Sequence, residues 1–208
     1  MTTLAPATAA AFFAVAVLLA LSPGPDNMFV LTQSAMRGRA AGLWVVLGLC
    51  SGLLVHTAAV AFGLAALFAT STLAFTALKW AGALYLLYLA WQAWRAPVGV
   101  LATQAPLDAG GLYRRGIIMN VTNPKVSIFF LALLPQFVTA ERGSVAMQVL
   151  WLGFIFMLAT LLVFGAIALA AGSLGQALAR SERAQQALNR CAALVFAALA
   201  LRLATVEA

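Results

Sequence analysis

The sequence predicts an all-α membrane protein with six transmembrane helices, arranged as two inverted three-helix repeats in which the first and fourth helices are broken at proline. Three observations lead to this prediction. First, 64% of the 208 residues are apolar and 8% are charged, with a mean hydropathy of +1.02, whereas soluble domains carry about 25% charged residues. Second, the apolar residues form six segments of about the length that crosses ~30 Å of hydrocarbon. Third, prolines interrupt two of these segments at matching positions.

The first three segments make up the first predicted repeat, residues 1–95. They run from about Thr8 to Met36, from Ala41 to Ala69 and from Thr72 to Trp94. The first segment is interrupted at residues 22–27, where Pro23, Gly24 and Pro25 predict a helix break. The second segment carries His56 and the third carries Lys79. Residues 96–113 are rich in Pro and Gly, and they predict a linker.

The last three segments make up the second predicted repeat, residues 114–208. They run from Arg114 to Val138, from Val145 to Leu174 and from about Ala187 to Val206. Asn-Pro-Lys at residues 123–125 interrupts the fourth segment, so Pro124 is the second predicted break. The fifth segment has no charge. The sixth is the weakest span, because Arg190 and Arg202 flank its apolar part and must extend from its ends to the membrane surfaces.

The order of the segments predicts how the halves are related. In each half a proline-broken segment is followed by an unbroken one and then by a shorter one. Since each half has an odd number of spans, the second half must be inverted relative to the first. Paired Gly and Pro interruptions of this kind are typical of inverted-repeat transporters, although prolines also occur in membrane helices without such a role.

The distribution of basic residues predicts the orientation in the membrane. Eight of the twelve Lys and Arg residues lie after the first, third and fifth segments: Arg37, Arg39, Arg95, Arg114, Arg115, Arg180, Arg183 and Arg190. Basic loops stay in the cytoplasm, so both termini are expected on the outer side. This pattern accounts for the net charge of +7 without a nucleic-acid partner. No Lys or Arg precedes Arg37, so the N-terminal apolar run is expected to be a retained span rather than a signal peptide.

The two breaks carry the residues most able to bind a ligand. Gly24-Pro25 and Asn123-Pro124 each resemble a helix N-cap followed by proline, so Asp26 and Lys125 occupy equivalent second positions. The half-helices that follow are ~15 Å long at 1.5 Å per residue, which puts both restarts near the bilayer midplane. Free N–H groups at such ends bind anions. Asp26 is suited to hold an ammonium group or a proton, and Lys125 to pair with Asp26 when the site is empty.

Each candidate also has a structural interpretation. Asp26 is favoured in a first helical turn by the helix dipole, whereas Lys125 opposes the dipole, and an intramembrane Lys costs ~2.5–3.5 kcal/mol on insertion scales. Lys125 is therefore the stronger functional candidate. The other candidates are Asn27, Asn120, Thr122, Asn123 and His56, each of which can either bind substrate or satisfy local polar groups. Gly48 and Gly52 form a GxxxG pattern, which most often marks close helix packing.

Three stretches together resemble the lysine-exporter superfamily, and most closely its homoserine/threonine-resistance (LysE/RhtB-type) branch. They are Pro-Gly-Pro-Asp-Asn at 23–27, the run from Leu78 to Leu89, and the segment from Arg115 to Phe137 with Asn-Pro-Lys at 123–125. The similarity covers nearly the whole chain, and the paired PGPDN and NPK motifs make it specific. Membership implies a multi-pass protein of the bacterial inner membrane that exports amino acids or their derivatives and is driven by the proton gradient.

One position departs from the family pattern. An acidic residue is common in the family three positions before the histidine of the second segment, and here that position is Leu53. The departure argues against a basic substrate, so the sequence predicts export of small neutral or polar amino acids by proton antiport, with coupling at Asp26 or His56. A cation exporter and a membrane-embedded enzyme are the alternatives. Neither a cofactor nor a metal is expected, since no Cys/His cluster has metal-ligand spacing. The expected partners are the lipid bilayer, the amino-acid substrate and protons, and the sequence is compatible with a homo-oligomer.

Overall fold

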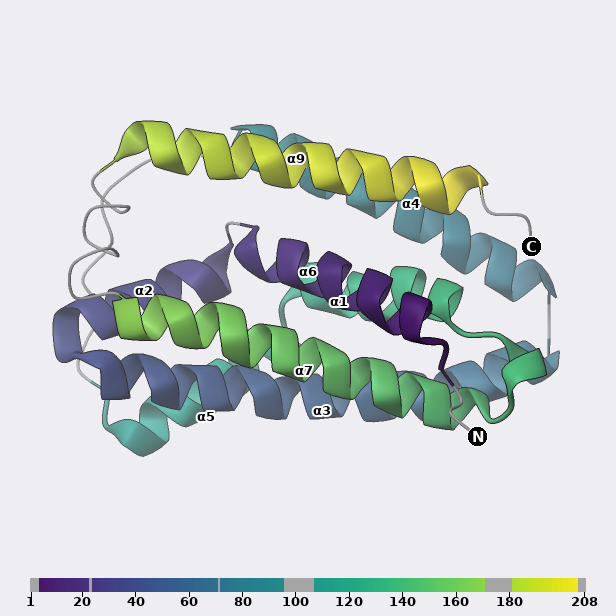
Figure 1. Ribbon diagram of the computed structural model, residues 1–208, viewed down its shortest axis with the longest axis horizontal. Coiled ribbons are helices and arrows are strands. Elements are labelled where there is room, and N and C mark those ends of the chain that lie inside the picture. Colours follow the sequence, from purple (N-terminus) through teal and green to yellow (C-terminus); the bar gives the residue numbers. More distant parts are fainter. Residues whose placement is uncertain (1–3, 23, 71, 96–106, 171–180, 206–208) are drawn as a thin grey trace.

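The computed structural model describes residues 4–22, 24–70, 72–95, 107–170 and 181–205, and every regular element in these ranges is helical (Figure 1). The predicted all-helical class is therefore confirmed for this part of the chain. The predicted break at Pro23 and most of the predicted linker fall outside the described residues.

The first half contains four helices: α1 (Pro6–Leu21), α2 (Pro25–Arg37), α3 (Arg39–Thr70) and α4 (Thr72–Arg95). Proline stands in the first turn of both α1 and α2, where its missing N–H costs no helical hydrogen bond. The axes of α1 and α2 differ by 63°. Gly38 ends α2 with a φ of 88°, a backbone conformation that glycine adopts without strain.

The second half begins with α5 (Ala109–Val121), α6 (Pro124–Ile128), the π-helix η1 (Phe129–Leu133) and the short 3-10 helices η2 (Leu134–Phe137) and η3 (Ala140–Arg142), followed by α7 (Val145–Ala170) and α9 (Glu182–Thr205). α5 begins inside the predicted linker because the Asp108 side chain caps it, accepting a hydrogen bond from the Gly111 N–H at 2.8 Å. α5 and the run Pro124–Phe137 make an angle of 48°.

Length and composition identify the membrane spans among the described helices. Arg39–Gly63 and Val145–Ala170 are each long and apolar enough to cross a membrane, and the two bent pairs raise the number to four if each pair is one span. The outer faces of these helices are apolar. On α7 the exposed side chains are Leu150, Trp151, Phe154, Leu158, Leu161 and Leu162. Such a continuous apolar surface requires lipid around it, so the protein is a multi-pass membrane protein.

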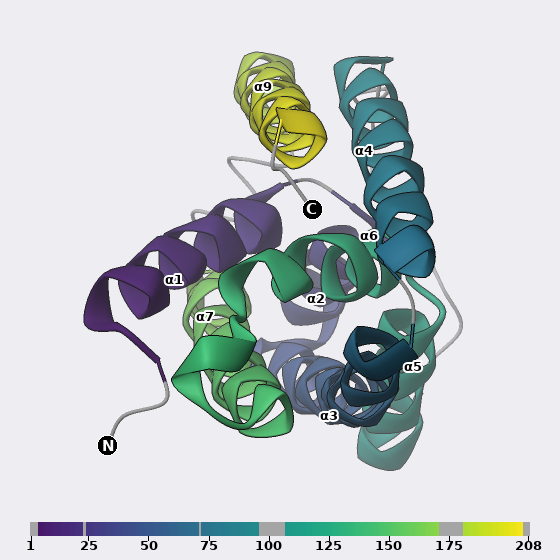
Figure 2. The ribbon, with the colours of Figure 1, turned by 90° about the vertical axis from the view of Figure 1, so that its right-hand side faces the viewer.

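The helices form two groups (Figure 2). In the larger group α3 packs along both α5 and α7, α1 packs on α7, and α2 packs on α3. α4 and α9 pack on each other and lie to one side of this group. The buried core joins residues of α1, α7 and η1 to residues of α3, α4 and α9. The end of α1, the start of α2 and the start of α6 meet inside the protein.

Glycine brings α3 and α5 into backbone contact. A Cβ atom added to Gly48 would overlap the carbonyl oxygen of Tyr113, and one added to Gly116 would overlap that of Val45. Gly52 meets Asn120 in the same way, since an added Cβ would lie 2.7 Å from the Asn120 side chain. The GxxxG pattern on α3 therefore packs against α5 of the same chain, and it holds Asn120 in place.

We expect Gly48→Ala to destabilise the protein by about 1–3 kcal/mol, the usual cost of overpacking a tight contact. The measurement is a thermal melt of the purified protein in detergent. Gly165→Ala is the matched control, because nothing lies within 4 Å of a Cβ added on that face of α7. The control should melt at or above the wild-type temperature, since alanine favours helix over glycine. Equal melting temperatures for the two variants would contradict the close α3–α5 contact.

Candidate functional site

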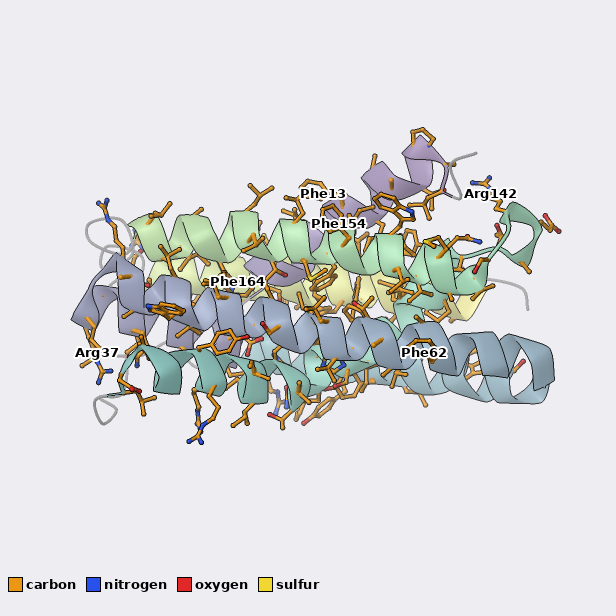
Figure 3. The ribbon with its side chains drawn as sticks, turned by 90° about the horizontal axis from the view of Figure 1, so that it is seen from below. Phe13, Arg37, Phe62, Arg142, Phe154 and Phe164 are labelled. Carbon is orange, nitrogen blue, oxygen red and sulfur yellow. The ribbon has the colours of Figure 1, made fainter. Side chains whose placement is uncertain are left out.

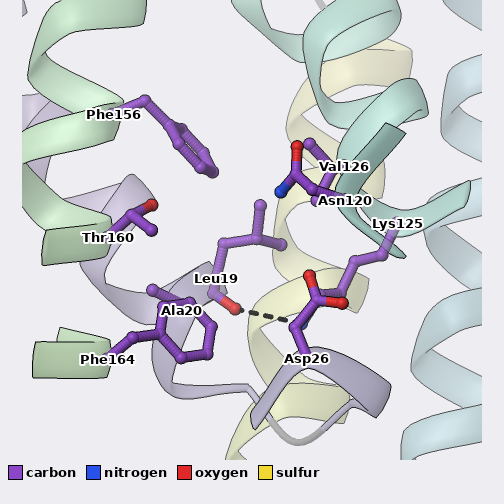
Figure 4. A pocket seen from close by; sticks show the side chains of 9 residues that line it. All are labelled: Leu19, Ala20, Asp26, Asn120, Lys125, Val126, Phe156, Thr160 and Phe164. Atoms are coloured by element: carbon purple, nitrogen blue, oxygen red, sulfur yellow. Dashed lines mark hydrogen bonds between the residues drawn. The ribbon is translucent and has the colours of Figure 1, made fainter. Parts of the chain in front are cut away.

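A small cavity lies where the end of α1, the start of α2, the junction of α5 and α6, and the middle of α7 converge (Figure 4). Its volume is about 20 Å³, which is room for about one water-sized group. Nine residues line it: Leu19, Ala20, Asp26, Asn120, Lys125, Val126, Phe156, Thr160 and Phe164. The wall thus combines two charged side chains, two neutral polar ones and an apolar surface that includes two aromatic rings.

Asp26 lies in the first turn of α2 and is 3% exposed. Its Oδ2 atom accepts a hydrogen bond of 2.8 Å from Nδ2 of Asn123, whereas its Oδ1 atom is buried without a partner. The N-cap residue of α2 is Gly24, and no side chain caps this end. The carboxylate of Asp26 is therefore directed into tertiary contacts and the cavity instead of serving as an N-cap.

Lys125 lies in the first turn of α6 and is also buried. Its Nζ atom donates to the carbonyl oxygens of Ser22 at 3.0 Å and Leu19 at 3.3 Å. These carbonyls belong to the C-terminal end of α1, where the helix ends and leaves acceptors unpaired, and where the helix dipole favours a positive charge. Lys125 is thus stabilised by α1, although it opposes the dipole of its own helix.

Gly24 makes this approach possible. A Cβ atom on Gly24 would lie 3.1 Å from the Nζ atom of Lys125. The described residues contain no direct ion pair between Lys125 and Asp26, yet both side chains line the same cavity. Two opposite charges are therefore buried beside each other, and each is held by neutral groups.

Asn123 joins the starts of the two half-helices. Its Oδ1 atom caps α6 by accepting from the Lys125 backbone N–H at 3.0 Å, while its Nδ2 atom donates to Asp26. Asn27 satisfies the backbone instead, because its Nδ2 atom donates to the carbonyl oxygen of Ala20 at 2.7 Å. Neither asparagine is among the residues that line the cavity.

The remaining sequence candidates lie at different distances from the cavity. Asn120 lines it. His56 is half-buried behind Asn120, with Nε2 3.2 Å from the Asn120 carbonyl oxygen and its ring centroid 5.5 Å from that of Phe130. Thr122 is exposed, and its hydroxyl donates to the Ile118 carbonyl oxygen at 2.7 Å. Leu53 is fully buried in the core.

Six of the nine cavity residues were not predicted from the sequence. Thr160 is the polar one, and the others are Leu19, Ala20, Val126, Phe156 and Phe164. Thr160 is 2% exposed in the middle of α7, the most apolar helix, and its hydroxyl has no partner. A polar residue in the middle of an apolar span was the available signal. Phe156 stacks against Phe129 and Phe130 of η1, with ring centroids 5.0 Å and 5.4 Å away. Phe12 of α1 joins the same cluster, its ring centroid 5.7 Å from that of Phe129.

Comparisons with known proteins give a consistent result. Residues 17–207 match the sequence profile described as LysE type translocator. The chain is 36% identical over 199 residues to the homoserine/homoserine lactone efflux protein of Salmonella typhimurium, covering 95% of this chain and 96% of that protein. It is 35% identical to an uncharacterized membrane protein of Vibrio cholerae, covering 95% and 97%, and 26% identical to the leucine efflux protein of Salmonella choleraesuis, covering 92% of each. No solved structure matches the chain.

Proposed function

Because the chain belongs to the LysE type translocator family, we propose that it is a secondary exporter of small neutral or polar amino acids or their derivatives from the cytoplasm. Relatives over nearly the full length are named as efflux proteins for homoserine, homoserine lactone and leucine. These compounds are compact and carry no charged side chain, which agrees with a cavity wall made of polar groups and aromatic rings.

The observation that carries the proposal is the buried charge pair at the cavity. Charged side chains inside membrane spans are expensive and are usually kept for function. Asp26 and Lys125 both line the cavity, and each comes from a helix that begins at a proline. An amino acid has the complementary pair of charges, since its ammonium group suits a carboxylate and its carboxylate suits an ammonium group.

We further propose six spans in two inverted repeats, with α1–α2 and α5–α6–η1–η2 as the broken spans. The packing supports this arrangement. In this arrangement α1–α2 corresponds to α5–α6, α3 to α7, and α4 to α9. A two-fold axis then exchanges the contact between α3 and α5 with the contact between α7 and α1. The same axis leaves the α3–α7 contact and the α4–α9 contact unchanged. All four contacts are present. Ligand sites of inverted-repeat transporters lie at the repeat interface.

We propose that the structure represents a closed state of such a transporter. The cavity of about 20 Å³ is too small for a whole amino acid, so loading and release require parts of the wall to move. The rings of Phe12, Phe129, Phe130 and Phe156 pack on one another, and Phe156 belongs to the cavity wall. We propose proton antiport as the driving force, with Asp26 as proton carrier, because Asp26 lines the cavity and its Oδ1 atom is buried without a partner.

The test is counterflow with purified protein in liposomes. Vesicles are loaded with unlabelled homoserine or leucine, and we expect them to take up the labelled amino acid by exchange. In a separate net-flux assay, we expect transport to collapse when the pH gradient is dissipated. Uptake that ignores amino acids but follows a cation gradient would favour the cation exporter, and conversion of the amino acid into a product would favour an enzyme. Either result would contradict the proposal.

The orientation is a separate prediction. Arg37 and Arg142 lie at opposite ends of the molecule (Figure 3), and α1 begins and α9 ends at the end that holds Arg142 (Figure 1). Eight of the twelve Lys and Arg residues lie after the first, third and fifth predicted segments, on the side of the membrane predicted to be opposite to both termini. Since basic loops stay inside, a reporter fused after Ala208 should be periplasmic. We expect an alkaline phosphatase fusion at this position to be active and a green fluorescent protein fusion to show no fluorescence. The reverse pattern would exclude this orientation.

A further inference from the structure

We propose that Asp26 and Thr160 form a subsite for the primary ammonium group of the exported amino acid, with its carbon body against Phe156 and Phe164. The inference rests on the proposed function and adds to it the part of the substrate that the cavity recognises. It places a substrate contact on α7, in a helix where sequence alone suggested none.

Unpartnered oxygen atoms belong to three of the residues that line the cavity (Figure 4). Asp26 Oδ1, Asn120 Oδ1 and Thr160 Oγ1 are buried without a hydrogen-bond partner, and their residues all line it. Each of these residues is 2–3% exposed. A buried polar atom without a partner costs about 1–3 kcal/mol. The Asn120 oxygen lies against Gly52 of α3, and its amide nitrogen points toward the cavity (Figure 4). The free oxygen atoms of Asp26 and Thr160 therefore indicate a ligand that donates hydrogen bonds.

Thr160 differs from the other buried threonines. A helical threonine normally satisfies its hydroxyl by donating to the carbonyl four residues earlier. Thr32 does so with Met28 at 2.6 Å, and Thr57 with Leu53 at 2.7 Å. Thr160 makes no such bond, although it lies well inside α7. Its hydroxyl is left available at the cavity.

The number and size of the groups favour a primary ammonium. Such a group has three N–H donors, enough for the free oxygen atoms of both Asp26 and Thr160, and the cavity of about 20 Å³ accepts one group of that size. A metal cation such as Ca²⁺ takes six or more oxygen ligands, whereas five of the nine residues that line this cavity are apolar. The apolar part suits the carbon body of an amino acid.

Lys125 provides the complement for the other end of the substrate. Its ammonium group has three donors, and two of them are used by the carbonyl oxygens of Leu19 and Ser22. One donor remains for a substrate carboxylate oxygen. The cavity thus presents acceptors at Asp26 and Thr160 and a cationic donor at Lys125, the arrangement that an α-amino acid requires.

The experiment measures recognition of the ammonium group. Counterflow of labelled homoserine in liposomes gives KM, and competition by 4-hydroxybutanoate, which is homoserine without its amino group, gives the preference for the amine. Thr160→Val removes the hydroxyl but keeps the shape. We expect its KM to rise about tenfold or more, the effect of losing one hydrogen bond to a charged group, and its preference for homoserine over 4-hydroxybutanoate to fall by a similar factor.

Three further variants make the result specific. Thr160→Ala removes the same hydroxyl with less bulk and should give the same change if the valine variant does not insert. Thr160→Ser restores the hydroxyl and should recover most of the preference. Thr57→Val is the matched control, because the Thr57 hydroxyl is already bonded within α3 and does not line the cavity. It should leave the KM and the preference unchanged.

Two results would overturn the subsite while leaving the exporter intact. One is an unchanged KM and amine preference in both Thr160→Val and Thr160→Ala. The other is an altered dependence on Na⁺ with an unchanged KM for homoserine, which would assign the oxygens to a metal ion. A wild-type protein that exchanges neither homoserine nor leucine would instead overturn the proposed function, and the subsite with it.

Discussion

Lys125→Ala is expected to abolish amino-acid export while the protein is still inserted in the membrane. The substitution removes the hydrogen-bond donor from the Ser22 and Leu19 carbonyl oxygens and leaves the Asp26 carboxylate without its buried cationic neighbour. Removing one partner of a buried charged pair typically costs about 3–5 kcal/mol. Among the described residues that line the cavity, Lys125 alone is cationic, so the same change deletes that charge. Efflux should therefore fall to background in loaded liposomes.

Two companion variants separate charge from shape. Lys125→Met keeps the length of the side chain without the charge, and it should also fail to export. Arg142→Ala removes an exposed positive charge on η3 and should export as the wild type does. Membrane insertion is followed by immunoblotting of washed membranes. Near-normal efflux from Lys125→Met would show that the ammonium group has no role in transport.

Local rules in the sequence predicted much of the site. Proline after Gly24 and after Asn123 predicted two helix starts, and helices do begin at Pro25 and Pro124. The equivalent second positions identified Asp26 and Lys125, both of which line the cavity. These features are set by bonds within a few residues, such as the Asn123 cap on the Lys125 N–H. Helix starts and the residues next to them can therefore be predicted from each segment of the sequence alone.

Contacts between distant segments were beyond such rules. Lys125 was expected to pair with Asp26, but it donates to the end of α1, over a hundred residues earlier in the chain. The reason is physical, because the helix end supplies two carbonyl oxygens with no other donor. Thr160 and Phe156 were missed because α7 is apolar all round, and its periodicity does not show which face meets the cavity. Thr122 was a candidate because it is close in sequence to the break at Pro124, but it does not line the cavity, and its hydroxyl donates to the Ile118 carbonyl oxygen instead.

The coupling between the two charges can be measured with Asp26→Asn. The asparagine keeps the shape of the side chain and an oxygen that accepts from Asn123, but it removes the negative charge beside Lys125. We expect Asp26→Asn to stop export, because neither a proton nor an ammonium group is held without the carboxylate. We also expect it to destabilise the protein, since Lys125 then lacks its buried counter-charge.

The double variant Asp26→Asn/Lys125→Met completes the cycle and carries the sharper test. No uncompensated charge remains in it, so it should melt at a higher temperature than either single variant although it does not transport. For charges that share one buried site we expect a coupling free energy of about 1–3 kcal/mol, obtained from thermal or denaturant unfolding of the four proteins in one detergent. Asn123 bridges Asp26 to the start of α6, so the cycle is repeated in Asn123→Ala. A smaller coupling there would show that the asparagine helps to transmit the interaction. Strictly additive effects in the wild-type background would mean that Asp26 and Lys125 are stabilised separately, each by the neutral groups that it contacts, and that the substrate alone brings them into one site.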